Sequence, residues 1–171
     1  MTDFAEYVPR THPTSSDESV ETRSAVPTDA DALAAVMAAR GGSVEEHVAA
    51  ARSLIERLDV LLIAEKEGLA VGWCGIQKFS IFPDAGPEWL IAGLTVVPEA
   101  RRRGIAARLL REVLQATPRT AKEELIFSVI NARNFASIDL HHEVGFVEVG
   151  RSAIFAGIEF TGGEGVLLRH L

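Results

Sequence analysis

The sequence predicts one α/β domain built on a mixed β-sheet of six to seven strands, with about four helices distributed over both faces. Three observations lead to this class. The strand-like segments first follow one another directly and then alternate with helical segments. One of them, EELIFSVI, shows little alternation, which is typical of a central strand. The 171 residues suffice for one medium domain with a buried core.

Residues 1–19 differ from the rest of the chain in composition. They are rich in Pro, Ser, Thr and acidic residues and show no apolar periodicity, which is typical of a flexible arm. The arm contains Phe4, Tyr7 and Val8, which could dock on the domain. We therefore expect the domain itself to cover residues 20–171, without an internal linker.

The first half of this domain is expected to contain a strand, two helices and a hairpin. Either Thr28 or Asp29 provides an N-cap for the first helix. Ser43 and Glu46 have the spacing of a capping box, which predicts the start of the second helix. Lys66-Glu67-Gly68 has the composition of a hairpin turn. The expected elements are a strand over 20–26, helices over 27–40 and 44–58, and a hairpin over 59–81.

The second half is expected to alternate strands with helices. Pro98 stops a long strand, and Pro118 follows a helix with one continuous apolar stripe. Asn134 precedes a second helical segment that ends at Gly145. The expected elements are strands over 88–98, 123–130, 146–155 and 166–171, and helices over 104–116 and 134–144.

Composition excludes several classes of function. The formal net charge of -7 argues against a duplex-binding surface and agrees with a cationic small substrate. Cys74 is the single cysteine, so neither a disulfide framework nor a metal-binding CxxC pair is expected, and its apolar segment predicts a packed thiol. No apolar run is long enough to span a membrane, and the acidic N-terminus lacks the pattern of a signal peptide. A cytoplasmic location is expected.

The segment VVPEARRRGIAARLL concentrates positive charge and glycine where a strand passes into a helix. The first amides of a helix have no partner inside it and attract anions. Gly104 has no Cβ to block a phosphate from the backbone, Ala106 keeps the next turn narrow, and Arg101, Arg102 and Arg103 add positive charge. The pattern favours a diphosphate site, and the alternative is a charged loop that caps a surface helix.

The segment LTVVPEARRRGIAARLL resembles the acyl-coenzyme A signature of the GNAT superfamily of N-acyltransferases. In that signature a strand Leu-x-Val-x-Pro leads into Gln/Arg-x-x-Gly-x-Gly/Ala, and Arg101, Gly104 and Ala106 fill the three fixed positions. The segment NFASIDLHHEVGF resembles the family's Asn-x-x-Ala/Ser helix followed by Gly-Phe. The two segments have the family's order, and the resemblance spans nearly everything after residue 20.

This resemblance implies a GNAT-like fold and acetyl-coenzyme A as co-substrate, with no metal. The diphosphate would lie on the backbone of residues 101–106, which includes Ile105. The strand over 88–98 would separate from its neighbour after the Leu-x-Val segment, and the amides of Leu94 and Val96 would hold the pantetheine arm there. Asn134 would contact the coenzyme, although it could instead be only an N-cap.

The resemblance also assigns candidate catalytic residues. His141 stands where the family most often has a Tyr that protonates the departing sulfur, and Glu143 with the helix end is expected to raise its pKa. The alternative for His141 is a semi-buried structural histidine. The family's usual base position holds Leu90, so Glu88, two residues earlier, would remove the amine proton through water. The alternative for Glu88 is a solvated strand end.

We therefore expect an N-acetyltransferase that brings acetyl-coenzyme A and the primary amine of a small molecule together for direct attack. The alternatives are an enzyme that acetylates a protein N-terminus or lysine, and a non-catalytic acyl-coenzyme A-binding module. No nucleic acid or membrane partner is expected, and a homodimer is left open. Acceptor contacts are expected from residues 28–58, 80–88 and 150–164.

Overall fold

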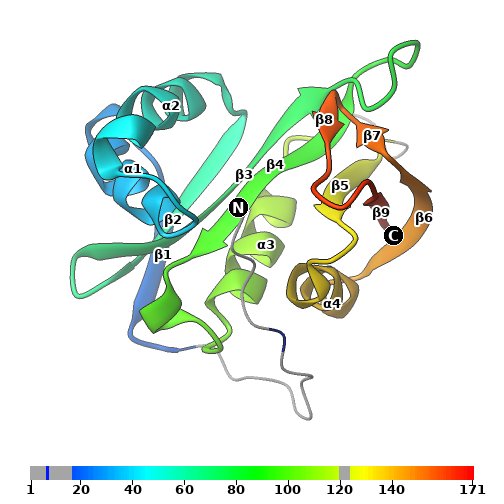
Figure 1. The fold of residues 1–171 in the computed structure, drawn as a ribbon. Helices are drawn as coiled ribbons and strands as arrows, with labels where there is room; N and C mark the ends of the chain where they lie inside the picture. The colour runs from blue at the N-terminus through cyan, green and yellow to red at the C-terminus, as the bar shows by residue number, and fades with distance from the viewer. Residues whose placement is uncertain (1–6, 8–16, 120–123) are drawn as a thin grey trace.

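The computed structural model describes Tyr7 and residues 17–119 and 124–171. It confirms the expected class, with one seven-stranded mixed sheet in the order β1-β2-β3-β4-β5-β9-β6 and a separate two-stranded hairpin, β7-β8 (Figure 1). The strands are β1 (Val20–Ser24), β2 (Val60–Lys66), β3 (Leu69–Phe79), β4 (Glu88–Val96), β5 (Ile126–Asn131), β6 (Phe146–Ser152), β7 (Ile154–Phe155), β8 (Ile158–Glu159) and β9 (Gly165–His170). The α-helices are α1 (Ala30–Ala38), α2 (Val44–Arg57), α3 (Ile105–Ala116) and α4 (Phe135–Glu143).

The helix starts in the first half follow local signals in two different ways. The capping box of α2 is confirmed, since Ser43 Oγ accepts from the Glu46 amide at 3.3 Å and Glu46 Oε2 accepts from the Ser43 amide at 2.7 Å. Asp29 precedes α1, but its side chain does not cap that helix. Its carboxylate instead accepts from the Val26 amide at 2.7 Å and pairs with Arg23 at 2.7 Å.

The two faces of the sheet carry different helices. Neighbouring residues of a strand point to opposite faces, and on β3 Trp73 packs with the core of α1 and α2 while Cys74 packs with α3. Helices α1 and α2 therefore cover one face, and α3 and α4 cover the other (Figure 1). Cys74 is a packed thiol as expected, and its burial raises its pKa.

The segment expected as one strand over 146–155 is divided into β6 and β7, which corrects that prediction. The chain turns back at Ala156 and Gly157, both with positive φ, so that β7 pairs with β8. This hairpin helps to cover a small apolar cluster that includes Leu90 of β4, next to Ile91 in the main core. The hairpin therefore lies on the same face of the sheet as α1 and α2, farther along it.

Within the described residues, the structure contains no helix that is long and apolar enough to cross a membrane.

Candidate functional site

Strands β4 and β5 separate soon after they meet. They pair in parallel only at Trp89 with Ile126 and at Leu90 with Phe127, although β4 continues to Val96. Beyond this point β5 stays paired with β9 along its other edge. The separation therefore begins after Leu90, earlier than the Leu-x-Val segment from which it was expected, and it leaves one edge of β4 facing a gap between the strands.

The hydrogen bond of the Val97 amide shows which way the backbone amides along this edge point. The Val97 amide donates to the Val71 carbonyl of β3 at 2.9 Å. Successive amides of a strand point to alternate edges, so those of Val96 and Leu94 point away from β3 and toward the gap. The structure therefore offers two backbone donors where β5 supplies no acceptor.

The turn after β4 closes one end of this gap. Arg101 is half-buried, and its Nε donates to the Val96 carbonyl at 3.0 Å. Arg102 and Gly104 both have positive φ, 60° and 74°, so the chain reverses sharply before α3. A left-handed backbone suits glycine, which explains Gly104 at the N-cap position.

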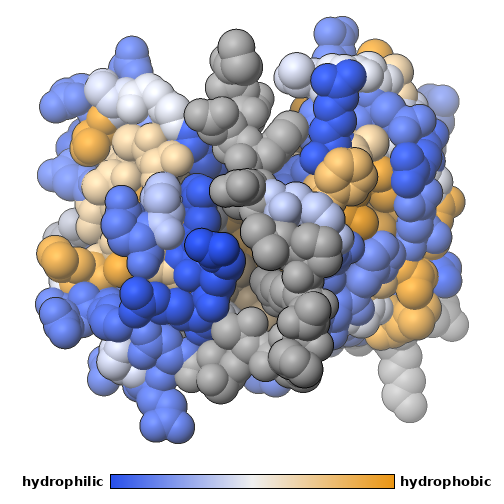
Figure 2. Space-filling view, turned by 60° about the horizontal axis from the view of Figure 1, so that its bottom comes forward, coloured by the Kyte–Doolittle hydropathy of each residue, from blue (hydrophilic) through white to orange (hydrophobic). Residues whose placement is uncertain are grey.

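The first turn of α3 lacks the side-chain cap that α2 has. No side chain caps it at Gly104, and the Arg108 amide makes the first bond back to the Gly104 carbonyl, at 3.0 Å. The amides of Ile105 and Ala106 therefore have no partner inside the helix. The face of the molecule seen in Figure 2 carries many hydrophilic residues, with apolar patches on its left and right sides. These uncapped amides beside three arginines can bind an anion.

The three arginines have different surroundings. Arg101 contacts the Val96 carbonyl, Arg102 is exposed, and Arg103 lies 3.5 Å from Asp17. Asp17 also pairs with Lys66 at 2.9 Å, and its amide donates to the Arg103 carbonyl. The hydrogen bond from Lys66 is the main reason that the pKa of Asp17 is lowered.

Tyr7 belongs to residues 1–19, the segment expected to form a flexible arm, and the structure describes its contacts. Its ring lies 5.7 Å from that of Phe135 at the start of α4, and a hydrogen bond with Asp139 raises its pKa. Two residues of the expected arm, Tyr7 and Asp17, therefore contact the domain, while Phe4 and Val8 lie outside the described residues.

Helix α4 brings Asn134 and His141 into one environment through Ser137. Asn134 Oδ1 accepts from the Ser137 amide at 3.2 Å, so Asn134 is an N-cap in this structure. His141 is 2% exposed, and its Nδ1 lies 2.8 Å from the Ser137 carbonyl. Because a carbonyl only accepts, Nδ1 carries the proton. Nε2 is buried and has no hydrogen-bond partner in the part of the chain that the structure describes.

The expected rise in the pKa of His141 is wrong. Burial lowers that pKa to about 4, since desolvation penalises the charged imidazolium more than the Ser137 carbonyl favours it. Glu143 does not compensate, and instead pairs with Arg111 at 3.0 Å. His142 is exposed, with Nδ1 2.9 Å from the Phe146 carbonyl.

Glu88 lies at the opposite end of β4 from the turn. It is the first residue of the strand and faces Phe79 of β3. Six residues separate it from Leu94, roughly 20 Å of extended chain. The structure therefore does not place Glu88 beside the amides of Leu94 and Val96, and any role in proton removal there requires intervening water.

Two residues near the gap had no signal in the sequence. A Cβ at Gly93 would overlap the indole of Trp73, so this ring crosses β4 next to Leu94. Its Nε1 is buried and has no partner among the described residues. Arg40 follows α1, and partial desolvation together with the positive charge of Arg101 lowers its pKa. An arginine before Gly41-Gly42 looks like an ordinary helix end, and a tryptophan in an apolar strand looks like ordinary core.

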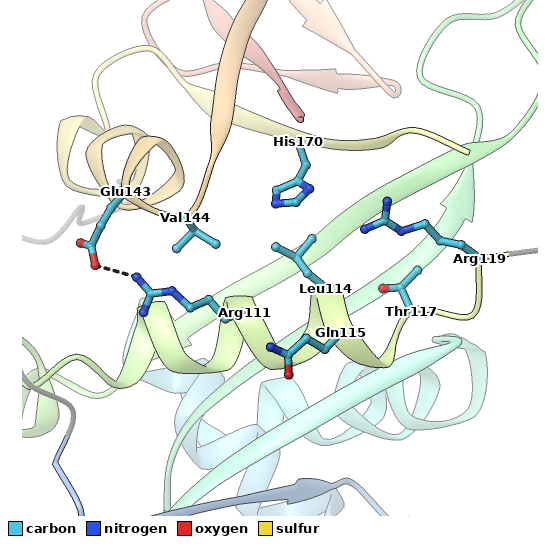
Figure 3. A pocket seen from close by; sticks show the side chains of 8 residues that line it. All are labelled: Arg111, Leu114, Gln115, Thr117, Arg119, Glu143, Val144 and His170. Atoms are coloured by element: carbon cyan, nitrogen blue, oxygen red, sulfur yellow. Dashed lines mark hydrogen bonds and ion pairs between the residues drawn. The ribbon is translucent and has the colours of Figure 1, made fainter. Parts of the chain in front are cut away.

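A hollow of about 530 Å³ lies at the other end of α3, away from the gap. Figure 3 shows Arg119 and His170 pointing toward one another inside it, with the Arg111–Glu143 pair at its edge. Burial and the charge of Arg119 lower the pKa of His170. None of the expected site residues lines this hollow. Among the described residues, no group of three or more His, Cys, Asp or Glu side chains could hold a metal ion.

Comparison with known proteins identifies a family and a common fold. A model of the acetyltransferase (GNAT) family matches residues 32–146. Ribosomal-protein-alanine N-acetyltransferase from Brucella melitensis is 24% identical, with a TM-score of 0.68 over 88% of this chain and 99% of that one. The protein yncA from Salmonella typhimurium, solved with its cofactor acetyl-CoA, is 19% identical, with a TM-score of 0.68 over 88% of this chain and 92% of that one.

A phosphinothricin acetyltransferase from Sinorhizobium meliloti, solved with acetyl-CoA, is 20% identical, with a TM-score of 0.65 over 89% of this chain and 88% of that one. No curated protein matches the chain. At these identities the solved structures show a shared fold.

The buried His141 predicts a specific pH dependence of stability. Its pKa is about 4 in the folded chain and about 6.5 in the unfolded chain. The contribution of neutral His141 to the free energy of unfolding is therefore complete above about pH 6.5 and is lost as the pH falls toward 4. Between pH 7 and about pH 4.5 the free energy of unfolding should fall by about 2 kcal/mol from this residue alone. Urea unfolding at the two pH values measures the fall.

His141→Asn cannot titrate, so its fall should be smaller than that of the wild type by about this amount. His142→Asn, at the neighbouring exposed position, should retain most of the fall. Equal falls in all three proteins would contradict the assignment to His141.

Proposed function

The chain belongs to the acetyltransferase (GNAT) family, and we propose that it transfers an acetyl group from acetyl-CoA to the primary amine of a small molecule. The family makes the protein an acyltransferase with acetyl-CoA as its co-substrate. One observation carries the proposal: the gap beside the free edge of β4 is contiguous with the uncapped start of α3. A cytoplasmic location is part of the same proposal.

The residues present fit the coenzyme at both ends of this site. The uncapped amides of Ile105 and Ala106, with the backbone of 101–104, would hold the diphosphate. The amides of Leu94 and Val96 would donate to the pantetheine arm and to the thioester carbonyl. Arg101 would leave the Val96 carbonyl, which could then accept from the arm. When bound, acetyl-CoA supplies the thioester that the acceptor amine attacks.

We propose that His141 delivers a proton to the sulfur as it departs. The histidine starts neutral, with Nδ1–H on the Ser137 carbonyl and Nε2 without a partner. Nε2 would first take up a proton from solvent water, because negative charge developing on the sulfur favours the imidazolium form, and would then pass that proton to the sulfur. Glu88 would accept the amine proton through a chain of several waters, since roughly 20 Å of strand separates it from Leu94. Asn134, at the start of the helix that carries His141, would contact the coenzyme.

Turnover separates this function from its alternatives. The purified protein is supplied with acetyl-CoA and a panel of small primary amines and short peptides, and thiol release is recorded. Release with small amines supports the proposal. Release only with peptides indicates a protein acetyltransferase, and binding of acetyl-CoA without release indicates a non-catalytic module.

The turn before α3 generates a prediction about coenzyme binding. Gly104→Asp adds a side chain at a left-handed residue and a negative charge beside the diphosphate. The affinity for acetyl-CoA, measured by calorimetry, should fall at least about tenfold, which is 1.4 kcal/mol. Gly86→Asp is the matched control, because Gly86 lies in the exposed loop before β4 with open space around it. Unchanged affinity in Gly104→Asp would remove the diphosphate from this turn.

A second prediction concerns the proton donor. His141→Ala should lower turnover at least about tenfold, because positioned acid catalysis typically contributes about 10²–10⁴-fold. The affinity for acetyl-CoA should stay within about twofold. His142→Ala should affect neither quantity strongly. Small and equal effects of the two variants on turnover would assign His141 to packing alone.

A further inference from the structure

Arg40 and Arg101 come from distant parts of the chain and lie near the same end of β4. Arg40 follows the last turn of α1, where its amide donates to the Met37 carbonyl at 3.0 Å. Met37 packs in the same apolar cluster as Ala92 and Val97, which places this end of α1 against the end of β4. Arg101 lies four residues after Val97 and reaches back to the Val96 carbonyl.

Arg40 is exposed and Arg101 is half-buried, and neither positive charge has a counter-charge within the described part of the chain. Desolvation, and after it the positive charge of Arg101, lowers the pKa of Arg40, so Arg101 lies close enough to act on Arg40. Neither forms an ion pair with a carboxylate among the described residues. The chain has 24 acidic and 17 basic side chains, so carboxylates are not scarce. A pair of unneutralised guanidinium groups is suited to an external oxyanion.

The position of Arg40 indicates which oxyanion this is. Arg40 lies on the face of the sheet that α1 and α2 cover, whereas the uncapped amides of α3 lie on the opposite face. The diphosphate of the coenzyme belongs to the α3 side. An anion that meets Arg40 therefore approaches the gap from the other face, the side left for the acceptor.

Trp73 supplies an independent observation on the same face. Its side chain is 6% exposed, shares the α1 cluster with Met37 and lies across Gly93, one residue before Leu94. Its Nε1 is a buried donor that has no partner among the residues the structure describes. Buried indole N–H groups are normally satisfied, so this end of the cluster lacks an acceptor oxygen.

We propose that the acceptor amine also carries a carboxylate, which Arg40 binds with Arg101 beside it. The inference rests on the proposed acetyl transfer and narrows its substrate class to amino acids and amines that carry a similar acid group. The acidic surface of the protein does not select this group. The arginine pair selects it locally, at the face of the gap from which the amine enters.

Matched acceptors test the inference. L-phenylalanine is compared with L-phenylalaninamide, and L-methionine with L-methioninamide, so that each pair differs only in the carboxylate. The measured quantity is kcat/KM for thiol release from acetyl-CoA. We expect the acids to be preferred by at least about tenfold, since a charged hydrogen-bonded partner is lost in the amides.

Three variants test whether Arg40 is responsible for the preference for acids over amides. Arg40→Gln should reduce the ratio of acid to amide to about one, and Arg40→Lys should keep part of it because the charge remains. Arg119→Gln removes an exposed arginine that follows α3, beside the hollow away from the gap, and should leave the ratio at the wild-type value. Calorimetry with acetyl-CoA should give the Arg40 variants an affinity within about twofold of the wild type.

Amides that react as well as the acids would overturn the inference and leave the proposed function intact. A loss of acetyl-CoA affinity in Arg40→Gln, matching its loss of kcat/KM, would also overturn it, because Arg40 would then bind the coenzyme. Absence of thiol release with every amine would instead contradict the proposed function on which the inference rests.

Discussion

The separation of β4 from β5 after two residue pairs is the constraint on which the rest of the site depends. A strand edge inside a protein normally finds partners, because an unsatisfied buried polar group costs about 1–3 kcal/mol. β9 holds β5 from its other edge, so the gap persists without closing the sheet. The amides of Leu94 and Val96 have no partner among residues 17–119 and 124–171. Because α3 follows β4 through one short turn, they are close along the chain to the uncapped amides of Ile105 and Ala106. The arrangement suits a ligand with an amide-bearing arm and a diphosphate.

The elements that sequence could predict are those with local signals. The capping box of Ser43 and Glu46 contains both of its partners within four residues, and the apolar stripe of α3 is visible from its own spacing. The place of β9 between β5 and β6 could not be predicted, since strand pairing across long intervals leaves no local pattern. The β7–β8 hairpin was missed because its strands are two residues long, below the length at which alternation is visible.

The same difference between local and long-range signals explains which features of the candidate site could be predicted. A motif on consecutive residues identified the turn at Gly104 and the strand edge, whose geometry depends on backbone conformation. The direction of the His141 pKa shift was wrong because it depends on burial by residues elsewhere in the fold, such as Phe146, whose ring lies 5.0 Å away. Arg40 was missed because its significance comes from Arg101, which is remote in the chain.

Amide hydrogen exchange, followed residue by residue by NMR, tests the central claim most directly. In the protein alone, the Leu94 and Val96 amides should exchange much faster than the Val97 amide, which donates to the Val71 carbonyl. Saturating acetyl-CoA should slow Leu94 and Val96 strongly and change Val97 little. Slow exchange of Leu94 and Val96 before addition, or unchanged exchange after it, would contradict the account that this strand edge binds the coenzyme.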